Sequence, residues 1–305
     1  MVTSKVKLQT AEYILLQQSF KEWLTVLNYS GFSIPGLTKT AKDFLLYQEQ
    51  NNKSSLQQIT ATDASTFIED LKTQTGERTK KPLSNGHINK QIQGLNLFSK
   101  YIRETARSSA GFSLKRLEEI RSKPGWLTKA EIQALYEATT DSVLGIRDRA
   151  MLAIYYGCGL RLNEGASLEL KDILTDRKIL HVRKGKHYKE RLVPVAGKNF
   201  EELKLYIDWA RPQLLQEKKT DDLFIGANKG VKMDKQSLYV RIKLLARKAK
   251  IKKKVGTHTL RHSIATHLLS SGMKLERIQQ FLGHSGLDST QIYTHLVNET
   301  GFAGS

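Results

Sequence analysis

Apolar side chains recur every three or four positions along most of this chain, which is the spacing of one face of an α-helix. The first segment of this kind carries Tyr13, Leu16, Phe20, Trp23, Leu24 and Leu27. The same spacing predicts amphipathic helices in the first 110 residues at 11–27, 37–50, 61–73 and 84–102. We therefore expect a helical first domain over residues 1–107.

The helical pattern breaks between residues 108 and 125, where small residues and proline stand among charges: Ser108, Ser109, Gly111 and Pro124. Residues of these types favour turns and loops over regular elements. We interpret 108–125 as a linker with a short helix at 114–121, and we expect a second domain over 126–305.

The second domain is predicted to be helical apart from one hairpin. Thr128 followed by Glu131 is a capping-box pattern that opens its first helix. Strand-like alternation over 179–183 and 191–195 flanks a basic loop, KGKHYKE. Apolar periodicity predicts helices at 129–138, 145–157, 163–170, 200–216, 234–248, 258–271, 275–282 and 289–296. The pattern thus predicts a mainly α fold with a small antiparallel β-sheet.

Composition excludes several classes of protein. Of the 305 residues, 39% are hydrophobic, enough to bury a sizeable core. The longest apolar run, 151–156, is far shorter than the roughly 20 residues of a membrane span, and the opening residues, MVTSKVKLQT, have no apolar stretch that resembles a signal peptide. A single cysteine, Cys158, excludes a disulfide framework and a Cys-rich zinc module. We expect a soluble cytoplasmic protein with no membrane partner.

The charge points to a polyanionic partner. Lys and Arg number 49 against 30 Asp and Glu, a net charge of +19, which favours nucleic acid. The densest basic run, 241–254, carries eight basic residues and no acidic residue. It could be a solvated helix face or a surface that binds along the phosphates of a nucleic acid. Candidate DNA contacts lie in this run, on the helix at 84–102 and in the hairpin loop: Lys90, Lys100, Lys186, Lys189, Arg241 and Lys243.

Candidate chemistry gathers in short segments of the second domain. In GCGLRLNEGASL, Arg161 and Glu164 are three residues apart, which places them on one face of a helix, and the preceding glycines allow close backbone approach. HTLRHS repeats this spacing with His258 and Arg261. LGHSGLDSTQIYTHL adds a histidine and a tyrosine nine residues apart, His284 and Tyr293.

These segments resemble the tyrosine recombinase (integrase) family, and its Xer-type and phage or transposon integrase members in particular. Two features carry the resemblance. The first is the order and spacing of Arg161, Lys184, His258, Arg261, His284 and Tyr293. The second is the sequence around these residues, in the segments GLRLNEG, KGKHYKERLVPV, THTLRHSIATHLL and LGHSGLDSTQIYTH. It implies a two-domain, C-shaped clamp. Residues 1–107 would be a helical, SAM-like core-binding domain, and 126–305 an α+β catalytic domain.

The residue types suit phosphodiester transfer on physical grounds. Negative charge grows on the non-bridging oxygens in the transition state, and fixed cations stabilise it. Arginine binds a phosphate bidentately, whereas histidine exchanges protons near neutral pH. A tyrosine phenol, with a pKa of about 10, needs a base or nearby cations before it attacks.

The resemblance assigns a role to each residue. Tyr293 would attack the scissile phosphate and form a 3′-phosphotyrosyl link. Arg161 and Arg261 would stabilise the transition state, with Glu164 orienting Arg161 or bracing the fold. Lys184 would be the general acid at the 5′ oxygen. His258 would assist proton transfer at the tyrosine, and His284 would hydrogen-bond the phosphate. The covalent link conserves the bond energy, so no ATP, metal or other cofactor is implied.

The resemblance also implies partners. The substrate would be a double-stranded recombination site with inverted half-sites, bound by a dimer, with a homotetramer on two sites and an accessory protein in some systems. The setting would be the bacterial nucleoid. Integration and excision, inversion and dimer resolution all fit. Only 12 residues follow Tyr293, which questions the tail docking that Xer-type relatives use.

The same residues are compatible with functions of other classes. A type IB topoisomerase shares the tyrosine chemistry but would relax supercoils at many sites as a monomer. His258 and His262 have the spacing of a helical metal pair, yet Thr259 stands where an HExxH motif has glutamate. A catalytically silent DNA-binding protein is disfavoured, because all the catalytic positions are filled.

Overall fold

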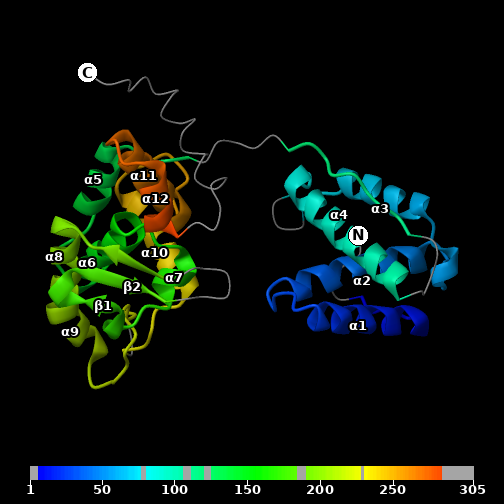
Figure 1. Cartoon of the computed structure of the whole chain (residues 1–305), viewed down its shortest axis with the longest axis horizontal. Coiled ribbons are helices and arrows are strands. Elements are labelled where there is room, and N and C mark those ends of the chain that lie inside the picture. Colours follow the sequence, from blue (N-terminus) through cyan, green and yellow to red (C-terminus); the bar gives the residue numbers. More distant parts are fainter. Residues whose placement is uncertain are drawn as a thin grey trace. The chain divides into compact units, whose positions relative to one another are not determined.

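The computed structural model describes most of the chain as two compact units, Met1–Ser122 and Lys123–Ser305 (Figure 1). The described residues are 6–76, 80–105, 111–119, 125–183, 190–227 and 230–283. They are mostly helical, with a small antiparallel sheet in the second unit, so the predicted fold class is confirmed. None of their helices combines the length and apolar character that crossing a membrane requires.

The first unit is built from helices that agree closely with the sequence prediction. They are α1 (Ala11–Val26), α2 (Ile34–Gln50), α3 (Ala61–Thr73) and α4 (Asn85–Glu104), with a 3₁₀ turn at Leu56–Gln58. The faces that carry the periodic apolar residues are the ones buried between these helices. Helix α4 packs closely against α2 at Gly94, where a Cβ atom would lie only 2.9 Å from Thr40.

The short helix predicted at 114–121 is wrong over its described part. Residues 111–119 are extended and pack along α4. Asn96 of α4 donates from Nδ2 to the Leu114 carbonyl and accepts the Leu114 N–H at Oδ1, at 2.9 and 2.8 Å. Ser99 and Asn89 bond both backbone groups of Phe112 and Leu117 in the same way. A helix would need these same backbone groups for itself.

The core of the first unit contains one poorly satisfied polar side chain, Gln48 of α2. It is fully buried, and neither its Oε1 nor its Nε2 has a hydrogen-bond partner among the described residues. A buried amide of this kind costs roughly 1–3 kcal/mol of folding free energy.

We expect Gln48→Met to raise the free energy of unfolding by about 1–2 kcal/mol, because methionine fills a similar volume without a polar group. Urea unfolding of the full chain measures the change. The exposed Gln50 lies on the same helix, and Gln50→Met should stay within about 0.5 kcal/mol of the parent. A less stable Gln48→Met protein would contradict the prediction, since it would mean that the amide is hydrogen-bonded when folded.

The second unit contains a three-stranded antiparallel sheet of order β1-β2-β3. Its strands are β1 (Ile173–Leu174), β2 (Ile179–Val182) and β3 (Arg191–Pro194). The pair Val182 and Arg191 ends the β2–β3 ladder. The helices of this unit are α5 (Lys129–Glu137), α6 (Val143–Leu152), α7 (Leu162–Ala166), α8 (Gly197–Leu205), α9 (Arg211–Leu215), α10 (Lys235–Lys248), α11 (Thr257–Ser270) and α12 (Leu275–Leu282), of which α12 packs against β3.

Three predicted helices differ from those observed. Two gain π-helical turns, at Ala153–Gly157 after α6 and at Tyr206–Ala210 between α8 and α9. The helix predicted at 163–170 ends at Ala166, because the backbone beyond it pairs elsewhere. The Leu223 N–H donates to the Leu168 carbonyl at 2.9 Å, and the Leu170 N–H donates to the Asp221 carbonyl at 2.8 Å. The helix predicted at 289–296 lies outside the described residues.

Candidate active site

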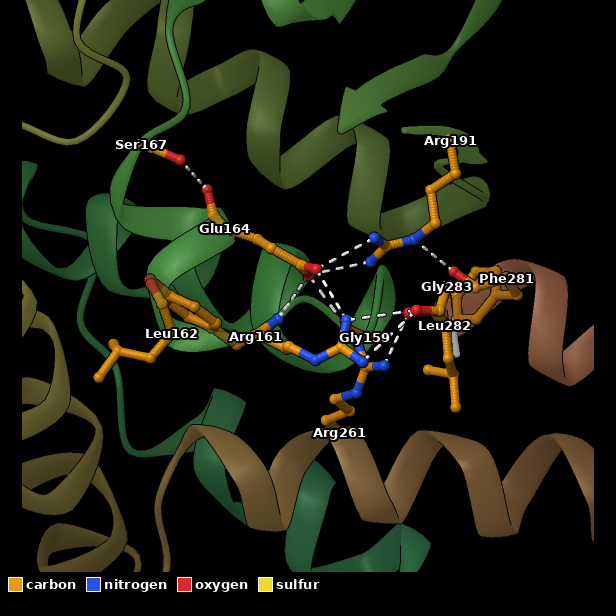
Figure 2. A network of polar contacts seen from close by, with 11 residues as sticks. Gly159, Arg161, Leu162, Glu164, Ser167, Arg191, Arg261, Phe281, Leu282 and Gly283 are labelled. Atoms are coloured by element: carbon orange, nitrogen blue, oxygen red, sulfur yellow. Dashed lines mark hydrogen bonds and ion pairs between the residues drawn. The ribbon is translucent and has the colours of Figure 1, made fainter. Parts of the chain in front are cut away.

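A buried carboxylate, that of Glu164, forms the centre of the candidate site (Figure 2). Glu164 lies in the first turn of α7, and Arg161 directly precedes that helix in extended backbone. The prediction that both lie on one helix face is therefore wrong in detail. The carboxylate instead folds back, accepting the Arg161 backbone N–H at 2.8 Å and its Nη1 at 2.9 Å. This double contact fixes both the chain and the guanidinium of Arg161.

Two more arginines converge on the same carboxylate from distant parts of the chain. Arg191 of β3 donates from Nη1 and Nη2 to its two oxygens at 3.1 and 3.0 Å. Arg261 of α11 places Nη1 3.8 Å from Oε2. The exposed side-chain fractions are 3% for Glu164, 4% for Arg261, 7% for Arg191 and 20% for Arg161. Of the three arginines, Arg161 is the most open to solvent.

The same arginines also bind the end of α12. Three successive carbonyls there, of Phe281, Leu282 and Gly283, accept bonds from Arg191, Arg261 and Arg161 respectively. The distances are 2.9 Å from Arg191 and 2.7 Å from Arg261, but 3.4 and 3.5 Å from the two Nη atoms of Arg161. The last carbonyls of a helix lack partners within it, so these guanidinium groups satisfy them.

Glycines permit this close packing. Gly159 has φ +62°, and a Cβ atom there would lie 2.8 Å from the Leu282 side chain. Its carbonyl accepts Nη1 of Arg261 at 2.6 Å. Gly283 ends α12 at φ +67°, where a Cβ would lie 2.9 Å from Arg191. The expectation that glycines before Arg161 allow close backbone approach is confirmed.

The site is cationic. Three guanidinium groups around one carboxylate leave a formal charge of +2. Burial alone would raise the pKa of Glu164, but hydrogen bonds and charges from Arg191 and Arg161 outweigh it and hold that pKa below its usual range. Glu164 is therefore ionised at neutral pH. The remaining positive charge is suited to an anion such as a phosphodiester.

His258 lies at the start of α11, one turn before Arg261. Partial burial of its ring lowers its pKa, and the charges of Arg261 and Arg161 lower it further. His262, one turn later, has a pKa lowered to about 4, first by burial and then by His258 and Arg261. Both rings are thus mainly neutral at pH 7, the state in which an imidazole accepts a proton. Within the described ranges, no group of three or more His, Cys, Asp or Glu side chains could hold a metal ion.

Three of the predicted catalytic residues, and two of the predicted DNA contacts, lie outside the described residues: Lys184, His284, Tyr293, Lys186 and Lys189. Strands β2 and β3 nevertheless end and begin where the predicted hairpin requires, at Val182 and Arg191. Helix α12 ends at Leu282, two residues before His284.

The other predicted DNA contacts differ in their surroundings. Lys90 is exposed on α4, and exposed Lys100 lies 3.6 Å from Glu104. On α10, Lys243 is exposed with its ammonium 5.4 Å from the ring of Tyr239. Arg241 is bound through Nε and Nη2 to the buried carboxylate of Asp148.

Arg191 was not singled out from the sequence, although a signal for it was present. In the predicted strand 191–195, alternation places Arg191 on the same face as Val193 and Val195, both of which are buried. An arginine on the inner face of a strand needs a buried anionic partner. The carboxylate of Glu164 is that partner.

Comparison with known proteins identifies a family for the second unit. Residues 125–300 match the phage integrase family. Tyrosine recombinase XerD of Proteus mirabilis is 39% identical over 212 residues, which are 68% of this chain and 67% of that protein. XerD of Pseudomonas putida is 43% identical over 174 residues, 57% of this chain and 58% of that one. The matches thus span about two thirds of these relatives or less.

A solved structure shares the fold. The crystal structure of XerH site-specific recombinase bound to palindromic difH substrate, in a post-cleavage complex, has a TM-score of 0.72 at 24% identity. It covers 94% of this chain and 82% of the XerH chain.

Proposed function

The chain belongs to the phage integrase family as a tyrosine recombinase of the Xer type, and from this we propose that it cleaves and rejoins DNA at a specific site through a 3′-phosphotyrosyl intermediate. The observation that carries the proposal is the buried Glu164 carboxylate with three arginines around it. The positive charge that remains is held rigidly in place and needs no reorganisation when a phosphate arrives, which is the main requirement for stabilising a phosphoryl-transfer transition state.

The proposed reaction uses Tyr293 as nucleophile. Its phenol oxygen forms a bond to phosphorus while the bond from phosphorus to the 5′ oxygen breaks. The phenol proton passes to neutral His258, and Lys184 protonates the leaving 5′ oxygen. Arg161 and Arg261 stabilise the charge on the non-bridging oxygens, and His284 hydrogen-bonds the phosphate. Rejoining reverses these steps with the 5′-hydroxyl of another strand, so neither ATP nor metal is required.

The proposed substrate is a double-stranded site with inverted half-sites, bound by a dimer, with two sites joined in a homotetramer. The palindromic substrate of the XerH structure supports the inverted repeat. We propose residues 1–107 as the core-binding domain and 126–305 as the catalytic domain, with Lys90, Lys100, Lys186, Lys189 and Lys243 near phosphates. We propose Arg241 as a further DNA contact, and its bond to Asp148 would also orient α10. The reaction would take place on DNA in the bacterial cytoplasm, with an accessory protein where the site requires one.

The runner-up, a type IB topoisomerase, is not favoured. Its chemistry would use the same arginines and tyrosine, so the site geometry alone does not separate the two enzymes. The curated relatives given above are named tyrosine recombinases. Site preference separates the two functions experimentally.

Covalent capture of DNA tests the proposed function. The protein is incubated with sheared DNA from its source genome in chelator, denatured in SDS, and the attached DNA is sequenced. We expect adducts concentrated at one short inverted-repeat site, because a recombinase cleaves only where paired protomers assemble. Scattered adducts would indicate a topoisomerase. No adduct at all, with source-cell extract also present, would count against strand cleavage.

A further inference from the structure

Arg191 occupies the junction of three segments of the site, and the proposed reaction gives it no role. It is the first residue of β3 and pairs with the last residue of β2, Val182. Its guanidinium uses Nη1 and Nη2 on Glu164 and Nε on the Phe281 carbonyl at 2.9 Å. All three of its guanidinium nitrogens are thus engaged by protein acceptors, and the side chain is buried.

The two bonds from the Arg191 guanidinium affect how Arg161 and Arg261 can interact with the Glu164 carboxylate. Arg191 engages both carboxylate oxygens, while the Arg161 guanidinium reaches Oε1 through Nη1 and Nη1 of Arg261 lies 3.8 Å from Oε2. Without Arg191, the buried carboxylate would need other donors, and these two arginines are the nearest. Each would be drawn inward, away from the position in which it stabilises a phosphate.

Arg191 also fixes where the end of α12 lies relative to that carboxylate. The Phe281 carbonyl that it binds directly precedes the Leu282 and Gly283 carbonyls bound by Arg261 and Arg161. A lysine at this position would keep the positive charge. Its ammonium group lacks the planar guanidinium geometry that allows Arg191 to make two parallel bonds to Glu164 and a third bond to the Phe281 carbonyl. The role of Arg191 therefore depends on its geometry as well as on its charge.

We propose that Arg191 is a positioning residue for strand cleavage: by binding both oxygens of Glu164 and the end of α12, it keeps Arg161 and Arg261 directed at the scissile phosphate. The inference rests on the proposed function. It predicts that loss of Arg191 acts on the same quantity as loss of Arg161, namely stabilisation of the non-bridging oxygens.

A change in the phosphate tests this directly. In a methylphosphonate, a methyl group replaces one non-bridging oxygen and removes its negative charge, so cleavage depends less on well-placed arginines. With a phosphodiester suicide substrate, we expect Arg191→Gln and Arg191→Lys to slow cleavage by about 10- to 100-fold, as for other groups that orient a catalytic residue. With the methylphosphonate at the same position, the defect should shrink to about threefold or less. DNA affinity should change less than the cleavage rate.

The matched control is Arg183→Gln. Arg183 follows β2 and binds the Ser167 carbonyl and the carboxylates of Glu169 and Asp172, without touching Glu164. This substitution removes the same charge from the residue that follows β2, so any effect should be equal on both substrates.

The outcomes are distinct. If the parent protein forms no adduct on either substrate, the proposed function fails. If the parent cleaves and the Arg191 variants are as active as the parent, or are slowed equally on both substrates, the positioning role fails, because a loss of folded protein slows both reactions alike. Thermal unfolding checks the folded fraction. If Arg191→Gln does not fold, the comparison of Arg191→Lys with the parent decides the question.

Discussion

We expect Tyr293→Phe to abolish the covalent DNA adduct and to leave DNA affinity within about twofold of the parent. Phenylalanine keeps the aromatic ring and removes only the hydroxyl that would attack the phosphate. Loss of a nucleophile commonly costs several orders of magnitude in rate, here expected to exceed about 10³-fold. SDS-stable adducts on a labelled site measure cleavage, and fluorescence anisotropy on the same DNA measures binding.

Other tyrosines of the second unit provide the control. Tyr155 is fully buried and burial raises its pKa, while the hydroxyl of Tyr156 lies 2.9 Å from Nδ1 of His267. Neither is suited to become a phenolate. Tyr239 of α10 is half-buried beside Lys243, and Tyr239→Phe should retain the adduct. An adduct that persists in Tyr293→Phe would show that another residue is the nucleophile.

Glu164→Ala is expected to lower the free energy of unfolding by about 3–5 kcal/mol, because it leaves three arginines around an empty buried position. For a domain of this size the melting temperature should fall on the order of 10 °C. Strand cleavage should fall as well, since the arginines lose the anion that arranges them. Calorimetry of the full chain measures the first effect, and adduct formation below the lowered transition measures the second.

The pH dependence of a second variant, Glu164→Gln, gives an independent check. The folded pKa of Glu164 is lowered, so its ionised form contributes stability that is fully present above the ordinary carboxyl pKa of 4.5 and is lost as pH falls through the folded value. The difference between the parent and Glu164→Gln should therefore narrow below about pH 4.5. The surface variant Asp208→Ala, which breaks an exposed pair with Lys204, should cost at most about 1 kcal/mol. A cost as small for Glu164→Ala would contradict the central role of this carboxylate.

Most helices could be predicted from apolar spacing, because in both units the faces that spacing marks are the buried ones. The predictions failed where the backbone makes non-local bonds. Residues 111–119 are extended because amide and hydroxyl side chains of α4 take up their backbone groups, and α7 ends early because the chain beyond it pairs with residues 221–223. Apolar periodicity reports only on residues three or four positions apart, so it does not predict these bonds between distant residues.

The candidate site was predictable in its residues but not in its connections. Arg161, Glu164 and Arg261 were all identified, and the structure brings them together. The alternation over 191–195 marks Arg191 as an inner-face residue, but the sequence does not show that its partner is Glu164, 27 residues earlier. The bonds to the end of α12 depend on the left-handed turn at Gly283.

The bonds to the end of α12 have a consequence for how the protein is made. Arg161 and the Gly283 carbonyl are 122 residues apart in the chain, and Arg261 and Gly159 are 102 apart. At a synthesis rate of 5–20 residues per second, roughly 6–24 s pass on the ribosome between Arg161 and Gly283. During that time the Arg161 guanidinium can bind Glu164, but it lacks the Gly283 carbonyl. The arrangement of the three arginines around Glu164 and the end of α12 is therefore complete only after α12 has been made.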